Sequence, residues 1–142
     1  MRGVKVGRVM SVGLGSGLLF GALDALIHAN PLAVRLYAPY RPMAKESVNM
    51  PAGLSIDLAQ GCIMAVIMLI LYQGLPGRTG WSKGLSFGVL VWFLRVVMPA
   101  ASTWIMLEVP LQTIGYMVVS GLAEMLILGL LYGLTLAPRE CT

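Results

Sequence analysis

The sequence predicts an all-α integral membrane protein built as a four-helix bundle. Apolar residues make up 58% of the 142-residue chain and charged residues only 11%, whereas a soluble domain carries about 25% charged residues. Four separate stretches are also long and apolar enough to cross a bilayer, which takes about 20 helical residues. We therefore expect residues 1–142 to form a single membrane domain, with the lipid bilayer as its main partner.

The transmembrane helices are expected at residues 9–29, 54–75, 81–107 and 111–136. Basic residues before the first apolar run resemble a signal peptide. However, Asp24 interrupts the run, and Ile27 with Ala29 matches a cleavage site poorly, so a retained first helix is favoured. The short connections 76–80 and 108–110 predict that the second and third spans, and the third and fourth, pack as antiparallel neighbours.

Residues 30–53 form the long outer loop, which holds four prolines. Its segment "LAVRLY" is either a short interfacial helix or a kinked continuation of the first span. Two tyrosines and two arginines make the loop a candidate docking surface or lid, although an interfacial loop with aromatic anchors is favoured. These residues are Arg35, Tyr37, Tyr40 and Arg41.

The distribution of Lys and Arg predicts that both termini are cytoplasmic, in a bacterial inner membrane. Six basic residues fall on the side that holds the termini: Arg2, Lys5, Arg8, Arg78, Lys83 and Arg139. Three fall on the opposite side: Arg35, Arg41 and Lys45. Trp81 and Trp104, near opposite ends of the third span, are expected to anchor it at the two membrane interfaces.

Glycines recur at every fourth position on three spans, a spacing that lets helix backbones approach closely in lipid. They are Gly13, Gly17 and Gly21, then Gly84 and Gly88, then Gly129 and Gly133. The spacing predicts helix packing and leaves open whether the contacts form within one chain or between copies.

An internal repeat is suggested by "GLLFGAL" (17–23) and "GLSFGVL" (84–90), which are 67 residues apart. The same offset carries His28 onto Arg95 and Asp57 onto Glu124. One explanation is two tandem helical hairpins related by a pseudo-two-fold axis along the membrane normal. The other is chance, since Gly and Leu match often in apolar sequence.

Five ionisable residues fall within the spans, where each costs about 2.5–3.5 kcal/mol on insertion scales. They are Asp24, His28, Asp57, Arg95 and Glu124, with the polar residues Gln60 and Ser120 on the same helix faces. Counting the helical rise from the nearest basic residue places Asp24, Arg95 and Glu124 near the midplane, and His28 and Asp57 nearer the outer side. We therefore expect Asp24 to point at Arg95 and His28 to meet Asp57.

Three carboxylates in this set face one guanidinium, which stays protonated, and one titratable imidazole. The excess of acid predicts a proton or cation site. The alternative is structural: buried polar groups can fix helix register, and Arg95 with Glu124 could form an ion pair.

Other chemical functions have less support in the sequence. Asp24, His28, Asp57 and Glu124 could ligate a single metal ion, but the paired Glu-x-x-His motifs of di-iron bundles are absent. No cofactor is predicted, because the chain has one histidine and lacks a P-loop and a dinucleotide fingerprint. Cys62 and Cys141 are expected to be inert thiols. The sparse basic residues argue against nucleic-acid binding.

Two functional hypotheses follow, and neither requires an enzyme. The first is a small transporter or channel, assembled as a homo-oligomer, that moves protons, a cation or a small polar solute past the ionisable residues. The second is a non-catalytic accessory or assembly subunit of a larger membrane complex. The excess of buried acid favours the first hypothesis, and the lack of a substrate motif favours the second.

Overall fold

The computed structural model describes residues 6–43 and 49–137, and every regular element among them is helical. Four helical stretches are long and apolar enough to cross a membrane: Val6–Ala29, Met50–Leu71, Gly80–Met106 and Leu111–Leu136. The all-α four-helix architecture is therefore confirmed, and the chain is an integral membrane protein. Residues of the sequence analysis that lie outside the described part are Arg2, Lys5, Lys45, Arg139 and Cys141.

The first span, α1 (Val6–Ala29), stops at Asn30, and a separate short helix, α2 (Pro31–Leu36), follows. Asn30 caps α2, because its side-chain oxygen accepts a hydrogen bond from the Leu32 N–H at 2.9 Å. Proline is favoured in the first turn of a helix because its missing N–H needs no partner there. The segment "LAVRLY" thus belongs to a distinct helix, which a 3-10 helix, η1 (Ala38–Met43), continues.

The second span, α3 (Met50–Leu71), begins and ends four residues earlier than expected. Its start is set by Asn49, whose side chain accepts a hydrogen bond from the Ala52 N–H at 3.1 Å. Its end is a turn in which the Gly74 N–H bonds to the Leu71 carbonyl at 2.9 Å. An asparagine cap and a glycine turn therefore fix the span.

The third span is not one continuous α-helix. It comprises α4 (Gly80–Trp92), a π-helical turn η2 (Phe93–Val97) and α5 (Met98–Met106). Pro99 has no N–H, so the Arg95 carbonyl lacks its usual partner four residues later. The Met98 N–H instead bonds to the Phe93 carbonyl, five residues back. The fourth span, α6 (Leu111–Leu136), is uninterrupted.

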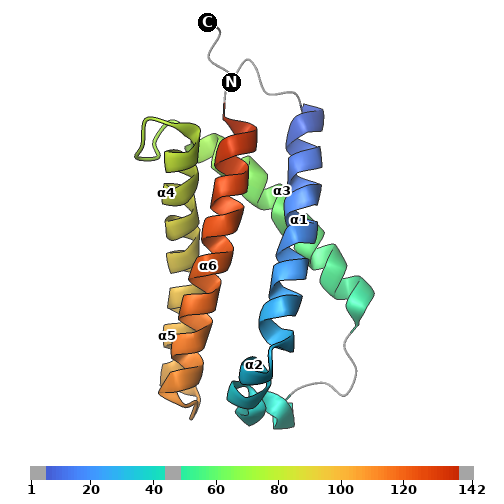
Figure 1. Cartoon of the computed structure of the whole chain (residues 1–142), viewed down its shortest axis with the longest axis vertical. Coiled ribbons are helices and arrows are strands. Elements are labelled where there is room, and N and C mark those ends of the chain that lie inside the picture. The colour runs from blue at the N-terminus through green and yellow to red at the C-terminus, as the bar shows by residue number, and fades with distance from the viewer. Residues whose placement is uncertain (1–5, 44–48, 138–142) are drawn as a thin grey trace, which may run out of the picture.

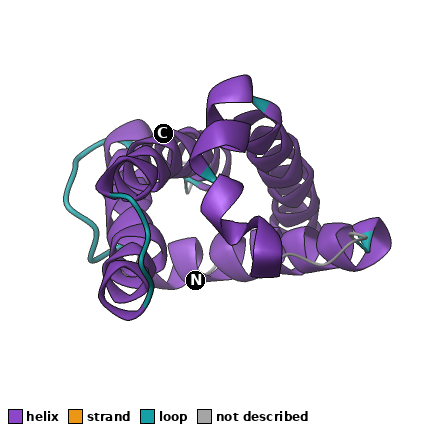
Figure 2. Ribbon diagram, turned by 90° about the horizontal axis from the view of Figure 1, so that it is seen from below, coloured by secondary structure: helices purple, strands orange, loops and turns teal. Residues whose placement is uncertain are grey.

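The spans pack as two close pairs, α1 with α3 and α4 with α6, and α1 also contacts α6. Figure 1 shows α4, α5 and α6 side by side, with α3 crossing obliquely behind α1. The view along the bundle in Figure 2 shows α3 running away from the other helices. The expected side-by-side packing of the third and fourth spans is confirmed, but that of the second and third is wrong.

The positions of the glycines explain why α3 packs against α1 and not against α4. A Cβ atom added at Gly17 would lie 2.7 Å from the Leu58 Cα, and one added at Gly61 would lie 2.8 Å from the Gly17 Cα. In the second pair, a Cβ added at Gly133 would lie 2.7 Å from the Gly84 Cα. Backbones this close need glycine. The glycine faces therefore join helices within one chain, and α1 offers α3 a better surface than α4 does.

At the end of the bundle where α1 begins and α6 ends, α3 and α4 meet only near their connecting turn. There Lys83 Nζ donates a hydrogen bond to the Tyr72 carbonyl at 2.7 Å and lies 4.6 Å from the Tyr72 ring centre. Trp81 and Trp104 are both more than half exposed at opposite ends of the third span, as expected of interfacial anchors.

Candidate functional site

The five ionisable residues come from all four spans. Asp24 and His28 lie on α1, Asp57 on α3, Arg95 in the π turn η2, and Glu124 on α6. Arg95 and Glu124 are each close enough to Asp24 and Asp57 for their charges to interact. The structure thus gathers residues distant in sequence into one region of the bundle.

Asp24 and His28 pair with each other. His28 Nδ1 lies 3.2 Å from Asp24 Oδ1 and 2.9 Å from the Asp24 carbonyl oxygen. Both side chains are about half exposed (49% and 50%). His28 therefore meets Asp24 and not Asp57 among the described residues, because residues four apart on one helix already face each other. Asp24 is close enough to Arg95 for their charges to interact, but no ion pair joins them in the described part of the chain.

Asp57 occupies the space that a glycine leaves open. A Cβ atom added at Gly21 would lie 2.8 Å from Asp57 Oδ2. The carboxylate of α3 thus rests on the surface of α1, one turn from Asp24. Gly21 serves this contact between a side chain and the helix, while Gly13 and Gly17 serve the contact between backbones.

Arg95 projects from the π turn toward α1, where its guanidinium carbon lies 4.4 Å from the centre of the Phe20 ring. Its Nη1 atom is buried and has no hydrogen-bond partner among the described residues. A buried polar group in this state is uncommon in folded proteins.

Glu124 is the most deeply buried of the five, with 7% of its surface exposed. Its Oε1 atom also has no hydrogen-bond partner among residues 6–43 and 49–137. Within the same residues the single ion pair is Asp24–His28, so the Arg95–Glu124 ion pair of the structural alternative is not formed. The site holds a carboxyl group and a guanidinium that are near each other but unbonded.

The two accessory polar residues behave differently from the ionisable ones. Ser120 Oγ donates to the Tyr116 carbonyl at 2.7 Å, a bond within α6, so its hydrogen is not offered to the cluster. Gln60, one turn from Asp57 on α3, is partly buried.

A tyrosine that the sequence analysis missed joins three helices. The Tyr132 hydroxyl on α6 donates to Ser16 Oγ on α1 at 2.7 Å and lies 3.1 Å from the Gly61 carbonyl oxygen on α3. Its ring meets Phe87 edge-on, with the ring centres 6.0 Å apart. A fully buried tyrosine needs a partner for its hydroxyl, so Tyr132 near the end of an apolar helix was an indication of such a junction.

At the opposite end of the bundle, Tyr116 was also missed. Its hydroxyl donates to the Ile27 carbonyl at 2.9 Å. That carbonyl would ordinarily bond to the N–H of residue 31, which is a proline and has none. Tyr116 therefore supplies the hydrogen-bond donor that the Ile27 carbonyl at the end of α1 would otherwise lack. Pro31 was the sequence feature that indicated the need for such a donor.

Tyr37 is the centre of an aromatic cluster beside His28. Its ring centre lies 5.1 Å from that of His28, 5.9 Å from that of Tyr40 and 6.2 Å from that of Tyr116. Burial raises the pKa of Tyr37 to about 12, with Tyr116 and Tyr40 adding to the shift. The start of the outer loop is thus packed on the helices by aromatic rings.

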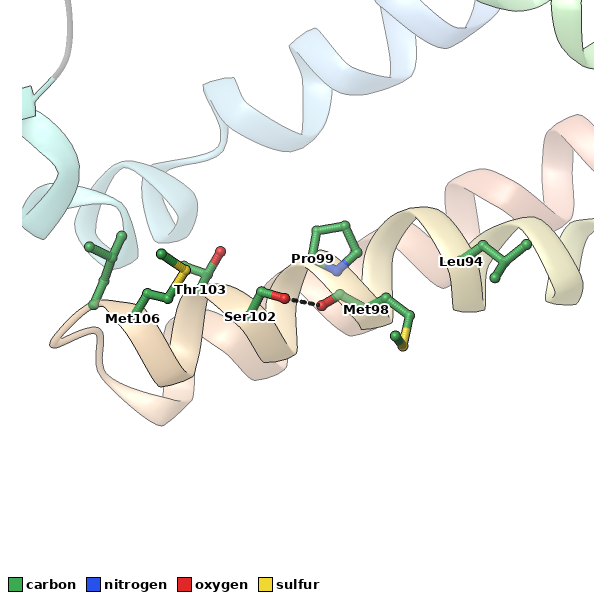
Figure 3. A pocket seen from close by; sticks show the side chains of 7 residues that line it. Leu94, Met98, Pro99, Ser102, Thr103 and Met106 are labelled. Carbon is green, nitrogen blue, oxygen red and sulfur yellow. Dashed lines mark hydrogen bonds between the residues drawn. The ribbon is translucent and has the colours of Figure 1, made fainter.

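An open groove lies elsewhere, along η2 and α5 (Figure 3). It is open, has a volume of about 580 Å³, and is lined by Leu94, Met98, Pro99, Ser102, Thr103, Met106 and Leu107. Its Ser102 hydroxyl donates to the Met98 carbonyl at 3.1 Å, as the dashed line in Figure 3 shows. The lining carries no ionisable side chain, so the groove and the charged cluster are separate features.

Of the four candidate metal ligands, Asp24 and His28 form the ion pair described above. No group of three His, Cys, Asp or Glu side chains arranged around a common point occurs among the described residues. Comparisons with protein-family models, with curated proteins and with solved structures each gave no match. The four apolar helices define the class of the chain, a small polytopic membrane protein.

Proposed function

We propose that this protein moves protons or a small cation across the membrane by way of Asp24, Asp57 and Glu124. The observation that carries the proposal is Glu124, a buried carboxyl group with an unpartnered oxygen. A carboxylate with only a structural role would form an ion pair, and Arg95 is the cationic side chain that could form it. Intramembrane ionisable residues are costly and mark ion pathways and proton relays.

The site has more acidic than basic side chains, so a mobile proton or cation is needed to balance its negative charge. Three carboxyl groups stand against Arg95, which remains protonated, and His28, which already contacts Asp24. Arg95 can offset one negative charge. The remaining carboxyl groups are neutralised by protons or by a cation, and exchange of these partners is transport.

The exposure of the acids suggests an order of binding. Asp24 is half exposed, Asp57 is partly buried against Gly21, and Glu124 is the deepest. Beyond Glu124, toward the start of α1, Phe87, Met125 and Tyr132 fill the core at 1–2% exposure. We place the entrance at the end with α2 and the barrier at this core.

In the proposed orientation the entrance faces outward and both termini are cytoplasmic. Four helices enclose little volume, and the half-exposed Asp24 and His28 would meet lipid in a single copy. We therefore propose a homo-oligomer in which a second copy covers this surface. The glycine faces are already used within the chain, so the contact between copies uses other faces of α1 and α3.

The test is flux in liposomes that contain the purified protein, with a pH-sensitive dye inside and a proton, sodium or potassium gradient across the membrane. Glu124→Gln keeps the side-chain shape and removes the charge, so we expect flux to fall to the level of protein-free liposomes. Glu108→Gln is the matched control, because Glu108 is exposed outside the spans. Equal flux in Glu124→Gln and the unmodified protein would refute the proposal.

Native mass spectrometry after gentle extraction separates the proposal from the accessory-subunit hypothesis. A homo-oligomer without other subunits supports transport by this chain. A stoichiometric complex with larger proteins, together with no flux from the purified chain, supports the accessory role.

A further inference from the structure

Arg95 and Phe20 form a contact that the proposed ion pathway does not by itself explain. The guanidinium carbon lies 4.4 Å above the Phe20 ring centre, and Phe20 is 7% exposed. A cation is attracted to the negative face of an aromatic ring, and the attraction is stronger when both groups are removed from water. The contact is therefore strong enough to compete for the position of the arginine.

The π turn that carries Arg95 is fixed against α6. Trp92 Nε1, just before the turn, donates to the Val118 carbonyl at 2.9 Å. A Cβ atom added at Gly121 would lie 2.8 Å from both methyl carbons of Val96. The turn thus presses on the face of α6 that holds Val118 and Gly121, and Glu124 continues that face one turn further along.

Arg95 nevertheless lies against Phe20 of α1. Its charge and that of Glu124 are close enough to interact, yet among the described residues no ion pair joins them, and each keeps a buried, unpartnered atom. A long, flexible arginine side chain next to a carboxyl group ordinarily bonds to it. A specific competitor must hold it elsewhere, and Phe20 is the group it touches.

We infer that Phe20 is a positioning residue: its ring holds the Arg95 guanidinium off Glu124 and so keeps that carboxyl group available to a proton or cation. The identity of the cargo rests on the proposed function, but the placement of Arg95 does not. An Arg95–Glu124 ion pair would occupy the acid with a permanent internal cation. Holding Arg95 on the ring keeps its positive charge nearby without closing the site.

The first test measures the carboxyl group directly, without any transport. Dicyclohexylcarbodiimide is a lipid-soluble reagent that modifies protonated carboxyl groups, and mass spectrometry of peptides locates the label. We expect Glu124 to be labelled in the unmodified protein and labelled several-fold less in Phe20→Leu, because the released guanidinium bonds to it. Phe20→Leu with Arg95→Gln should restore labelling, which would identify Arg95 as the cause.

A second series separates the electrostatics of the ring from its shape. Phe20→Tyr keeps the aromatic face and should retain the labelling of the unmodified protein. Replacing Phe20 with phenylalanines that carry one, two or three ring fluorines preserves packing while weakening cation–π attraction step by step. Labelling of Glu124 and flux should decline in the same order, whereas a purely structural role would leave both unchanged.

The outcomes are distinct. Equal labelling of Glu124 in Phe20→Leu and the unmodified protein, both folded by thermal unfolding, would overturn the inference. A labelling difference without flux from the unmodified protein would overturn the proposed function and leave the role of Phe20 standing. If Phe20→Leu does not fold, the fluorinated series tests the inference instead, because these replacements preserve packing.

Discussion

The two helix pairs solve the same packing problem in different ways. In the pair α1–α3, Gly17 faces Leu58, and Asp57 rests beside Gly21. The 67-residue offset of the repeat carries Gly17 onto Gly84 and Leu58 onto Met125. In the pair α4–α6, however, Met125 faces Gly88, one turn further along α4.

This shift gives the two acids different surroundings. Asp57 remains partly exposed, whereas Glu124 is buried, about one turn along α6 from Gly121, which contacts the π turn. Two similar glycine contacts, offset by one helical turn, thus leave the Asp57 carboxyl group partly exposed and bury that of Glu124. Whether the pairs arose by duplication stays a prediction, but their difference shows how helix register can set the access to an ionisable group.

The largest expected effect comes from filling the glycine contact of the second pair. A Cβ atom in Gly129→Ala would lie 2.9 Å from the Gly88 Cα, and it also clashes with the Gly84 carbonyl. Backbone cannot move aside easily, so we expect the free energy of unfolding to fall by about 3 kcal/mol, at the upper end for overpacking. Gly61→Ala should cost less, about 1–2 kcal/mol, because α3 packs mainly on α1 within the chain and can shift as a unit.

Thermal unfolding in detergent checks both values. Gly115→Ala on α6 and Gly53→Ala on α3 are the matched controls, since neither added Cβ meets an atom within 4 Å. Equal losses at Gly129 and Gly61 would mean that the two pairs are held equally firmly, contrary to the comparison.

A smaller effect is expected where the two pairs are joined. Tyr132→Phe removes the hydroxyl that bonds to Ser16 and approaches the Gly61 carbonyl. We expect a loss of about 1–2 kcal/mol, the value of a buried hydrogen bond whose partner is left behind. Tyr72→Phe is the control, because it keeps the ring that contacts Lys83. No change in unfolding temperature for Tyr132→Phe would show that the pairs are held together by apolar packing alone.

The smallest effect is the coupling between Arg95 and Glu124. Because their charges interact without a hydrogen bond, the coupling free energy between Arg95→Gln and Glu124→Gln should be small, about 0.5 kcal/mol, at the lower end for neighbouring residues. The double variant, compared with both single variants in the same unfolding assay, gives the coupling. If each single change lowers stability and the double variant recovers it, the two residues form a structural ion pair after all.

Much of the fold was predictable because length and apolar composition alone define a membrane span. Helix ends were displaced by a few residues where Asn49 and Gly74 override the hydropathy. The order of packing was not predictable from loop length: a short connection brings two helix ends together but does not choose the faces, and the glycines of α1 proved the better surface for α3.

The candidate site was predicted as a set of residues but not as a set of contacts. Depth counted along a helix assumes upright spans, whereas α3 is oblique (Figure 1), so His28 and Asp57 do not pair. The π turn also changes the direction of Arg95, although Pro99 was visible in the sequence. Phe20 resembled any apolar core residue, because its partner lies 75 positions away in the chain.

The π turn also has a consequence for the phase of the third span. It acts as one residue inserted into an α-helix, and each residue rotates an α-helix by about 100°. The stripe that Gly80, Gly84 and Gly88 present to α6 therefore does not run on into α5. Deleting one residue between 93 and 97 would remove the inserted residue, and one end of the span would turn by more than a quarter of a circle relative to the other. The irregularity therefore means that α4 and α5 both contact α6, but with different faces of the same span.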